Sequence, residues 1–379
     1  MAELRLGGRT RDIASALAPH PEASTLPREF YLDPEIYRLE TEHAMRAQWL
    51  PLARVDQVPE PGDYLATAIL GEQLVITRDR DGELRVLSNV CRHRAMPVAE
   101  GSGNCSVLRC PYHLWTYRLD GSLSGAPLMA ARPGFDRSAI VLPQVRHEVW
   151  QGWLMVNLGG AAPPLSPQVP TLSAELAGWD FTDLRVVASS SYDCPWDWKL
   201  TVENFGEYYH HFGLHKDSLE PFLPAKRGRC LDNRGEPWNS SVIDCSSDYL
   251  ELQGRVMPGL DADLATTMQI FTVFPFLCAG AQGSSAFWLQ ITPQSPRRHT
   301  VTWHVLVRPE QAAWSDAEEF AAMSLSAIDV LQQEDARACR GVQAGLGSTT
   351  AAPGRFADLE LSLWQFQVWL LGRLAEGSR

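Results

Sequence analysis

The chain has 379 residues, of which 45% are hydrophobic and 21% charged, a composition typical of a globular protein of about two domains. Its formal net charge of −12 argues against nucleic acid and anionic membrane surfaces as partners, because both repel an acidic protein. The longest apolar run, Phe271 to Ala281, is short and contains Pro275, so no membrane span is expected. The polar residues 1–24 lack the apolar core of a secretory signal, and we expect a cytoplasmic protein.

The first predicted element is a helix over 33–48, with Asp33 as its N-cap and Pro34 in its first turn. The residues that follow alternate between apolar and polar, which predicts antiparallel strands joined by hairpins. The small-residue and proline run 159–164 then predicts a domain junction. The expected turns of this β region are 71–72 and 79–82, and its later strands are 139–142 and 150–158.

The second half of the chain mixes strand and helix patterns. Strands followed by long helices predict an α+β domain whose antiparallel sheet carries helices on one face. We therefore divide the chain into an N-terminal segment (1–47), an all-β domain (48–158) and a larger domain (159–379). The strands expected in the larger domain are 185–191, 269–273, 287–291 and 300–307, and its helices are 198–210, 316–340 and 358–375.

A first group of metal-binding side chains lies in the β domain. Cys91-x-His93 is followed after sixteen residues by Cys110-x2-His113. A [2Fe–2S] cluster needs four ligands, and two imidazoles in place of two thiolates on one iron raise its reduction potential. Each Cys–His pair follows a strand pattern, so two loops can each give one sulfur and one nitrogen. The sequence therefore predicts a [2Fe–2S] cluster held by Cys91, His93, Cys110 and His113.

A zinc site is the main alternative for these residues. Zinc fingers place two cysteines together and two histidines together, usually before a helix, whereas here each pair is mixed and surrounded by strand patterns. Cys105 lies between the pairs without a histidine nearby, and we expect it to take no part. The remaining cysteines are expected to be free thiols, mostly buried: Cys194, Cys230, Cys245, Cys278 and Cys339.

A second group lies in the larger domain, where Glu207-x2-His210 is followed by x4-His215. Non-haem Fe(II) oxygenases bind their metal with two histidines and one carboxylate and leave positions open for dioxygen and substrate. The two histidines are five apart, so we expect the helix to bulge or end near Gly213. This spacing also differs from the four-residue spacing of HExxH zinc proteases.

The carboxylate of this second site has two candidates. Glu207, expected one helical turn before His210, could bind the iron or accept a hydrogen bond from a ligand. Asp335 is the better ligand candidate, and of it and its helix neighbour Glu334 at most one should face the site. His211 must point away from its neighbour His210, and we expect a structural role for it.

These residues resemble the Rieske non-haem iron oxygenases, the α subunits of ring-hydroxylating oxygenases and their relatives. The resemblance covers most of the chain, including the Cys110-Pro-Tyr-His-Leu-Trp115 loop, the Trp198-Lys-Leu and Glu203-Asn-Phe lead-in, and the Glu-x-Tyr-His segment. It extends to Glu334-Asp335 followed by Gln343 and Gly345. It implies a Rieske domain inserted near the start of a helix-grip catalytic domain, with one [2Fe–2S] cluster and one Fe²⁺ per subunit.

The resemblance also implies roles and an assembly. Asp335 would be the third iron ligand after His210 and His215, and Glu207 would link the two metal centres. In the family, the cluster of one subunit reduces the iron of its neighbour in a ring-shaped homotrimer. Glu207 would then accept hydrogen bonds from His210 and from a cluster histidine, His113, across the subunit boundary.

Electrons must come from elsewhere, because no GxGxxG motif after a strand predicts a nicotinamide or flavin site in this chain. The expected partner is a separate NAD(P)H-dependent reductase, with or without a ferredoxin. The predicted activity is that of a Rieske-type oxygenase acting on a small organic substrate with O2. A Rieske electron carrier without catalysis is the other class of function, but it would need only the first domain.

The sequence supports two hypotheses for the substrate class. The Glu203-Asn-Phe-Gly-Glu207 spacing looks more like choline, carnitine and glycine-betaine monooxygenases than naphthalene-type dioxygenases, and aromatic faces hold quaternary ammonium groups by cation–π attraction. Aromatic clusters are usually core, however, and an aromatic pocket also suits a flat ring, so hydroxylation of an aromatic compound is the alternative. The side chains expected to contact substrate are Tyr208, Phe212, Phe271 and Trp288.

Overall fold

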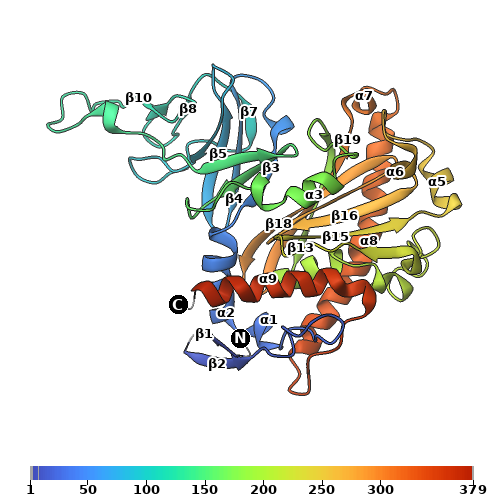
Figure 1. The fold of residues 1–379 in the computed structure, drawn as a ribbon. Helices are drawn as coiled ribbons and strands as arrows, with labels where there is room; N and C mark the ends of the chain where they lie inside the picture. The colour runs from blue at the N-terminus through green and yellow to red at the C-terminus, as the bar shows by residue number, and fades with distance from the viewer. Residues whose placement is uncertain (1–2, 7, 378–379) are drawn as a thin grey trace. The chain divides into compact units, whose positions relative to one another are not determined.

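A computed structural model describes residues 3–6 and 8–377 (Figure 1). The chain forms two compact units, one from the residues up to Pro51 and from Ala162 onward, the other from Leu52–Ala161. The smaller unit is thus an insertion in the sequence of the larger one. Within the described part of the chain, no helix combines the length and apolarity that crossing a membrane requires.

The smaller unit is built from short antiparallel strands in three sheets, ordered β6-β5-β4-β7, β11-β12-β3 and β10-β9-β8. The strand expected over 139–142 is wrong, since a 3₁₀ turn, Arg137–Ala139, and a single bridge from Val141 to Ser122 occur there. The strands are β3 (Leu50–Arg54), β4 (Asp63–Ile69), β5 (Glu72–Arg78), β6 (Leu84–Ser88), β7 (Ser102–Asn104), β8 (Leu108–Arg109), β9 (Thr116–Tyr117), β10 (Leu123–Gly125), β11 (Arg146–Trp150) and β12 (Trp153–Asn157).

The larger unit contains a seven-stranded antiparallel sheet ordered β13-β19-β18-β17-β16-β15-β14, which confirms the predicted α+β class. A separate hairpin pairs β1 with β2. The strands of this unit are β1 (Glu3–Leu6), β2 (Arg9–Asp12), β13 (Arg185–Cys194), β14 (Gly228–Cys230), β15 (Trp238–Asp244), β16 (Thr267–Val273), β17 (Leu277–Gln282), β18 (Ser285–Ser295) and β19 (Arg298–Val307).

Helices surround this sheet. The helix expected over 33–48 is split, because a π-helical segment, Glu40–Arg46, follows α2. The α-helices are α1 (Glu29–Leu32), α2 (Pro34–Leu39), α3 (Pro170–Glu175), α4 (Trp198–Phe205), α5 (Ser247–Gln253), α6 (Ala262–Ala265), α7 (Pro309–Ala312), α8 (Ala317–Leu346) and α9 (Leu361–Gly377).

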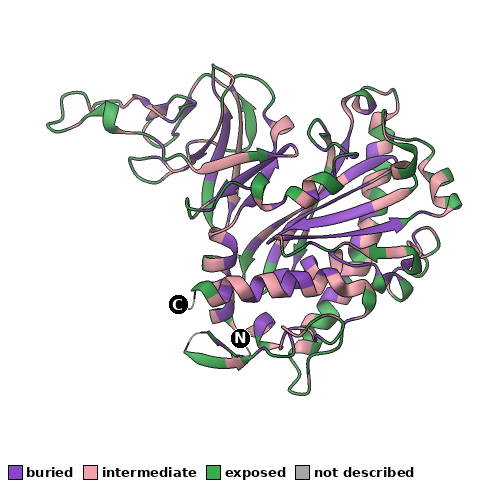
Figure 2. Cartoon of the chain, in the orientation of Figure 1, coloured by how far each residue is buried: buried purple, intermediate pink, exposed green. Residues whose placement is uncertain are grey.

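The two faces of the sheet have different partners, as alternation along each strand requires. On one face, Ser241 and Phe274 contact Ser362 and Phe366 of α9. On the other face, Trp179 after α3 donates to Gln269 from its indole nitrogen at 2.7 Å. The central strands are therefore buried on both sides, as Figure 2 shows.

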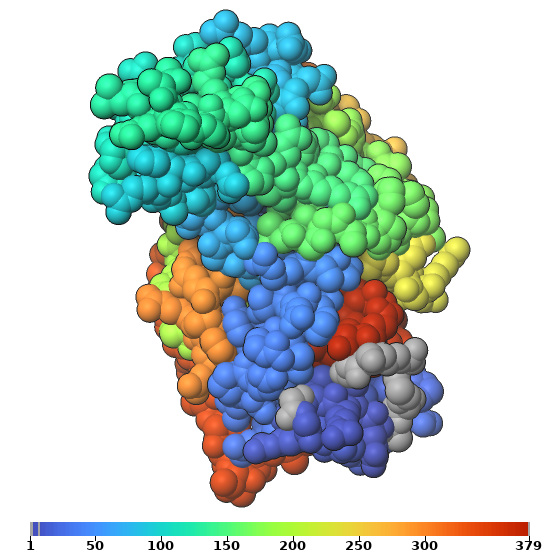
Figure 3. Space-filling view, turned by 90° about the vertical axis from the view of Figure 1, so that its left-hand side faces the viewer, coloured from blue at the N-terminus to red at the C-terminus, as the bar shows by residue number. Residues whose placement is uncertain are grey.

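The N-terminal segment packs against the C-terminal helix of the same unit (Figure 3). The side-chain amide of Gln367 donates to the carbonyls of Ala16 and Ser24, and the Trp364 indole donates to the carbonyl of Ala18. Residues far apart in the sequence thus satisfy each other's buried polar groups.

A buried ionic cluster joins the N-terminal segment to α4. Lys199 Nζ lies 2.9 Å from Glu40 and 2.8 Å from Asp197, and all three side chains are almost fully buried. Beside them, Tyr31 donates a 2.7 Å hydrogen bond to Glu203. Burial raises the pKa of Glu203 to about 8, so this carboxyl is held in its neutral form around neutral pH.

Candidate active site

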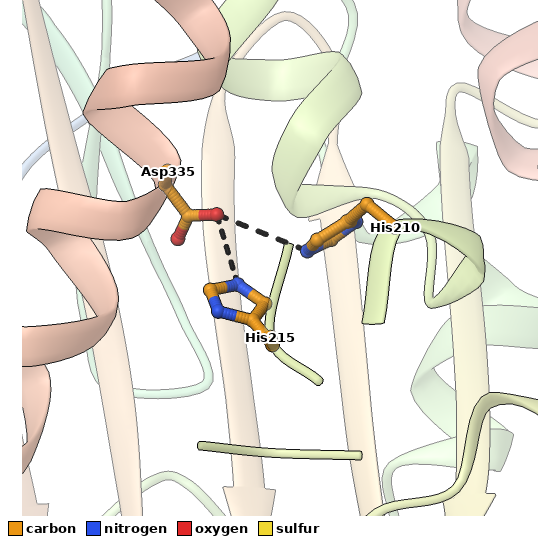
Figure 4. Close-up of side chains that lie close together, drawn as sticks. All are labelled: His210, His215 and Asp335. Atoms are coloured by element: carbon orange, nitrogen blue, oxygen red, sulfur yellow. Dashed lines mark hydrogen bonds and ion pairs between the residues drawn. The ribbon is translucent and has the colours of Figure 1, made fainter. Parts of the chain in front are cut away.

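Three of the predicted ligands converge in the larger unit (Figure 4). Asp335 Oδ1 lies 3.0 Å from His215 Nε2 and 3.8 Å from His210 Nε2. Among the described residues, these three form the group of His, Cys, Asp and Glu side chains that is close enough to hold one metal ion. Two imidazole nitrogens and one carboxylate oxygen are the donor set of non-haem Fe(II) sites.

The chain leaves the helical path before it reaches the histidines. Helix α4 ends at Phe205, so the helix expected over 198–210 is too long, and Glu207 does not share a helix face with His210. A separate 3₁₀ turn, Tyr209–Phe212, carries His210, and His215 follows after a further turn. This early break lets two histidines five residues apart face the same point.

Asp335 comes from the middle of α8, a 30-residue helix. Its Oδ1 also accepts a 3.2 Å hydrogen bond from Asn204 Nδ2, at the end of α4. The carboxylate is therefore oriented by a neutral donor as well as by the two imidazoles. No sequence signal indicated this contact, because the helix was expected to continue past Asn204 to residue 210.

Each of the two histidines has a carboxylate on the nitrogen that faces away from Asp335. Glu207 Oε1 lies 2.6 Å from His210 Nδ1, and its second oxygen accepts from the His210 backbone N–H at 3.0 Å. Glu334 Oε2 lies 2.7 Å from His215 Nδ1 and also accepts from Ser218 Oγ at 2.6 Å. Such partners fix the ring orientation and leave Nε2 free for a metal.

As expected, only Asp335 of the two adjacent acids joins the two histidines, but Glu334 also contacts His215. Asp335 points at the metal side of His215, while Glu334 reaches the opposite nitrogen of the same ring. A histidine ring is wide enough for adjacent residues on one helix to contact its two edges. His211, by contrast, is buried, and its Nδ1 lies 3.1 Å from the carbonyl of Leu223. Burial, with the charge of His210, lowers the pKa of His211 to about 3.

A cavity of about 390 Å³ opens beside the three ligands, between α8 and the inner face of the sheet. Of the four side chains expected to contact substrate, Tyr208 lines it. Phe212 does not, and half of its surface is exposed to solvent.

Phe271 and Trp288 also lie outside the cavity, contrary to expectation. Phe271 packs edge-on against Phe181 at 5.4 Å, and Trp288 stacks on His304 at 4.6 Å, on the far face of the sheet. Side chains alternate along a strand, so their neighbours face the cavity instead. The lining residues missed from these two strands are Met268, Ile270, Ser285, Ala286, Phe287 and Leu289.

In the smaller unit, the two predicted cluster loops have the same local structure. Cys91 N–H donates to the carbonyl five residues on, and its carbonyl accepts from Ala95 N–H four residues on, at 2.9 and 3.0 Å. The Cys110 loop repeats both bonds at 2.8 and 3.0 Å, the second from Leu114. Ala95 and Leu114 both have positive φ, and each closes its turn four residues after the cysteine of its loop.

The four predicted cluster ligands lie at one end of this unit. Cys91 and Cys110 are buried in its core, and the rings of His93 and His113 are 4.5 Å apart. Trp115 stacks on His93, and the hydroxyl of Tyr117 lies 3.3 Å from Cys91 Sγ. Cys105 has no histidine beside it; its backbone N–H donates to the Gly62 carbonyl.

The residues fit an iron–sulfur cluster better than one zinc ion. Four zinc ligands would lie within about 4 Å of one another, but within the described residues these four do not form a group that close. A two-iron cluster divides its ligands between two metals and needs the wider spacing. His113 Nδ1 is buried without a hydrogen-bond partner, as a ligand nitrogen would be. The donor atoms at His210, His215 and Asp335 likewise fit one iron.

Comparison with known proteins matches both units. Residues 181–376 match the family of the ring hydroxylating alpha subunit (catalytic domain), and residues 48–145 match the Rieske [2Fe-2S] domain. The oxygenase subunit of carnitine monooxygenase from Acinetobacter baumannii is 33% identical over 191 residues, which are 50% of this chain and 52% of that protein. This match thus spans about half the length of that relative.

Other similarities cover more of the chain. Chloroplastic choline monooxygenase from Arabidopsis thaliana is 26% identical over 93% of this chain and 83% of its own. The structure of a quaternary ammonium Rieske monooxygenase, described with inter-subunit electron transfer, superposes with a TM-score of 0.81 at 23% identity, covering 93% of this chain and 95% of that one. The last of these shows a common fold. With more than half of its residues matched, the chain belongs to the ring-hydroxylating α-subunit family and carries a Rieske [2Fe–2S] domain before its catalytic domain.

Proposed function

We propose that this chain is the terminal oxygenase component of a Rieske-type system, in which His210, His215 and Asp335 bind Fe²⁺. Cys91, His93, Cys110 and His113 hold the [2Fe–2S] cluster. The observation that carries the proposal is the presence in one chain of the open His–His–Asp site and the paired cluster loops. A protein that only carries electrons would not need the His–His–Asp site, and an iron hydrolase would not need the cluster loops.

The chemistry that iron supplies at this site is the activation of dioxygen by electrons that arrive through the cluster. In hydroxylation, one oxygen atom enters a C–H bond, and the other leaves as water after two electrons and two protons are taken up. Asp335, His210 and His215 occupy one side of the metal position, which leaves the cavity side free for O2 and substrate. Glu207 and Glu334 hold the two imidazoles in the orientation that this requires.

The electrons come from a separate NAD(P)H-dependent reductase or ferredoxin, and the chain works as a homotrimer. Tyr112 and Leu114 in the second cluster loop are more than half exposed, so the end of the Rieske domain is open to another protein. In the homotrimer, Glu207, which contacts His210, accepts a hydrogen bond from His113 of the neighbouring subunit. The similar monooxygenase described with inter-subunit electron transfer supports this arrangement.

The favoured substrate is a quaternary ammonium compound, which is hydroxylated or dealkylated next to its nitrogen. The names of the carnitine and choline monooxygenases support this class. Aromatic rings in the cavity wall, such as Phe287 and Trp303, can hold an ammonium group by cation–π attraction. The second candidate is hydroxylation of an aromatic compound, which the predominantly apolar lining of the cavity also favours.

Metal content tests the site assignment. Asp335→Asn should bind two irons per chain instead of three and retain the cluster spectrum, because only the mononuclear site is damaged. Asp329→Asn, on the same helix but hydrogen-bonded to Tyr192, is the matched control and should keep three. His210→Ala should behave like Asp335→Asn. Loss of the cluster spectrum in either variant, or zinc in the wild type, would contradict the proposal.

Turnover tests the reaction. The iron-loaded chain is combined with a surrogate reductase and NADH, and oxygen uptake and product mass are measured. A hydroxylated or dealkylated amine supports the favoured substrate class, whereas a cis-diol from an aromatic compound supports the second candidate. Dioxygen uptake without any oxygenated product across both classes would count against both.

A further inference from the structure

The cavity beside the iron ligands is long rather than compact. Its wall follows α8 from Asp335 back to Phe320. These positions are fifteen residues apart, so the wall extends about 22 Å along the helix axis. Exposed apolar side chains of Leu252 and Met323 also line it, which places an opening on the α5 and α8 side. A substrate at the iron therefore has room to extend along the helix.

The section nearest the ligands is aromatic. Phe205 follows Asn204, the residue that donates to Asp335, and its ring lies 6.3 Å from Phe287. Phe287 lies 5.7 Å from Trp303, whose indole donates at 2.7 Å to Gln332, three residues before Asp335. Three rings thus surround the position where the reacting group of a substrate would lie.

Much of the remaining wall is apolar. It is lined by Met268 and Ile270 of β16, Leu289 of β18, and Ile328 and Leu331 of α8. These side chains offer no hydrogen bond to a polar substrate group. An ionised carboxylate held there would lose its hydration, which costs several kcal/mol without a partner.

No lining residue of the cavity, within the described part of the chain, is a lysine or an arginine. The charged groups in the wall include the carboxylates of Glu207 and Asp335, which repel an anion. Arg255, beyond α5, is paired with Asp316 and lies 4.7 Å from the Trp314 ring, outside the lining. Among the described residues, the wall therefore offers no lysine or arginine that could pair with the carboxylate of a substrate that extends away from the iron.

The section farthest from the iron is polar but neutral. Gln253, Gln282 and Ser285 line it with Tyr249, whose hydroxyl donates to Gln282. Gln253 Nε2 is buried beside Tyr249. This section adjoins the start of α8, because Gln311 of α7 donates at 2.9 Å to the carbonyl of Ser284. It can bind a hydroxyl, an amide or a carbonyl.

We infer that the substrate has no carboxylate and carries an extended apolar body, with any polar tail uncharged. This inference rests on the proposed oxygenase function and narrows its substrate. Carnitine and glycine betaine are both carboxylates, so the chain should discriminate against them despite its similarity to enzymes that are named for them. An ammonium compound with an alkyl or hydroxylated tail fits this wall: the aromatic rings can contact its ammonium group, the apolar side chains its alkyl chain, and the neutral polar side chains a hydroxyl group.

Binding of matched pairs to the iron-loaded protein tests this inference by calorimetry. Hexyltrimethylammonium is compared with 6-(trimethylammonio)hexanoate, and naphthalene with 2-naphthoate; each pair differs mainly by one carboxylate. The carboxylate member should bind at least tenfold more weakly. Equal or tighter binding of the carboxylate member overturns the inference, and so does failure of both carboxylate-free probes to bind.

The two pairs separate this inference from the proposed function. If naphthalene binds and hexyltrimethylammonium does not, the quaternary ammonium class fails, but the inference is still judged by the naphthalene pair. If the hexanoate binds more tightly and is turned over, the proposed function stands and the inference fails.

A charge placed in the wall provides the converse test. Ala327 is exposed on α8 and lines the cavity, so Ala327→Arg should fold and should improve binding of the hexanoate at least tenfold. Val330→Arg, one turn away, exposed and outside the lining, is the matched control and should change it little. Equal gains in both variants would mean that the cavity is not where the carboxylate binds.

Discussion

Glu334 Oε2 lies 2.7 Å from His215 Nδ1, on the edge of the ring opposite the one that faces Asp335. Two consecutive residues of α8 therefore hold one histidine from both sides. Glu334 also accepts a hydrogen bond from Ser218 Oγ at 2.6 Å, so α8 contacts the loop that carries His215 through both His215 and Ser218.

Glu334→Ala should weaken iron binding by about 10- to 100-fold, because a ligating histidine that loses its outer partner is no longer fixed in tautomer or orientation. Iron affinity is measured by competition with a chelator, with the cluster absorbance as an internal standard. Gln333→Ala, which removes an exposed hydrogen bond to Asp329 on the same helix, should retain wild-type affinity. An unchanged iron affinity in Glu334→Ala would show that Asp335 and the loop suffice.

Glu207→Gln should retain all three irons but slow the transfer of electrons from the cluster to the mononuclear site at least tenfold. Glutamine retains an acceptor oxygen for His210 and removes the negative charge between the proposed partners. Stopped-flow absorbance of the reduced cluster after mixing with O2 and substrate measures the rate. Glu220→Gln, at a carboxylate that accepts from the backbone of Ala225, is the control. A wild-type rate in Glu207→Gln would remove its linking role.

Tyr117→Phe should lower the reduction potential of the cluster. The Tyr117 hydroxyl lies 3.3 Å from Cys91 Sγ, and a hydrogen bond to a ligand sulfur stabilises the reduced, more negative cluster. A hydrogen bond to a charged group is worth up to about 3 kcal/mol, which sets an upper limit of about 130 mV for one electron. Redox titration measures the shift; Tyr112→Phe, at an exposed hydroxyl paired with Arg94, should show none.

Stability should fall as pH rises between about 4.5 and 8, partly because of Glu203. Burial raises the pKa of Glu203 to about 8 in the folded chain, so across this range the folded state keeps a proton that the unfolded state has lost. The slope approaches ~1.4 kcal/mol per pH unit. Glu203→Gln keeps an acceptor for Tyr31 and should flatten the denaturation profile, whereas the exposed Glu319→Gln should not. Parallel profiles for wild type and Glu203→Gln would contradict this assignment.

The sequence predicted the α+β class and the chemistry of both sites because those depend on residue type and spacing. Two pairs that each contain one cysteine and one histidine are typical of few sites other than a Rieske cluster. Cys91 and His113 could therefore be recognised as candidate ligands without knowledge of the fold. Asp335 could be chosen over Glu207 by family resemblance, and the structure brings it to the two histidines.

The cavity wall could not be predicted in the same way. Phe271 and Trp288 were selected as aromatic residues, but the face of a strand on which a residue lies depends on register, and a shift of one position reverses it. The early end of α4 at Phe205 was also missed, because Gly206 follows it with ordinary helical φ and ψ and gives only a weak local signal.

Helix α8 carries both Asp335, the proposed iron ligand, and one wall of the adjacent cavity. Ile328 and Leu331 contact whatever fills the cavity, and Asp335 lies one to two turns further along the same rigid rod. A molecule that displaced those side chains along the helix would also displace the Asp335 carboxylate. Under the proposed function, α8 would therefore link occupation of the cavity to the geometry of the iron site, so that dioxygen would be reduced only when a substrate is present.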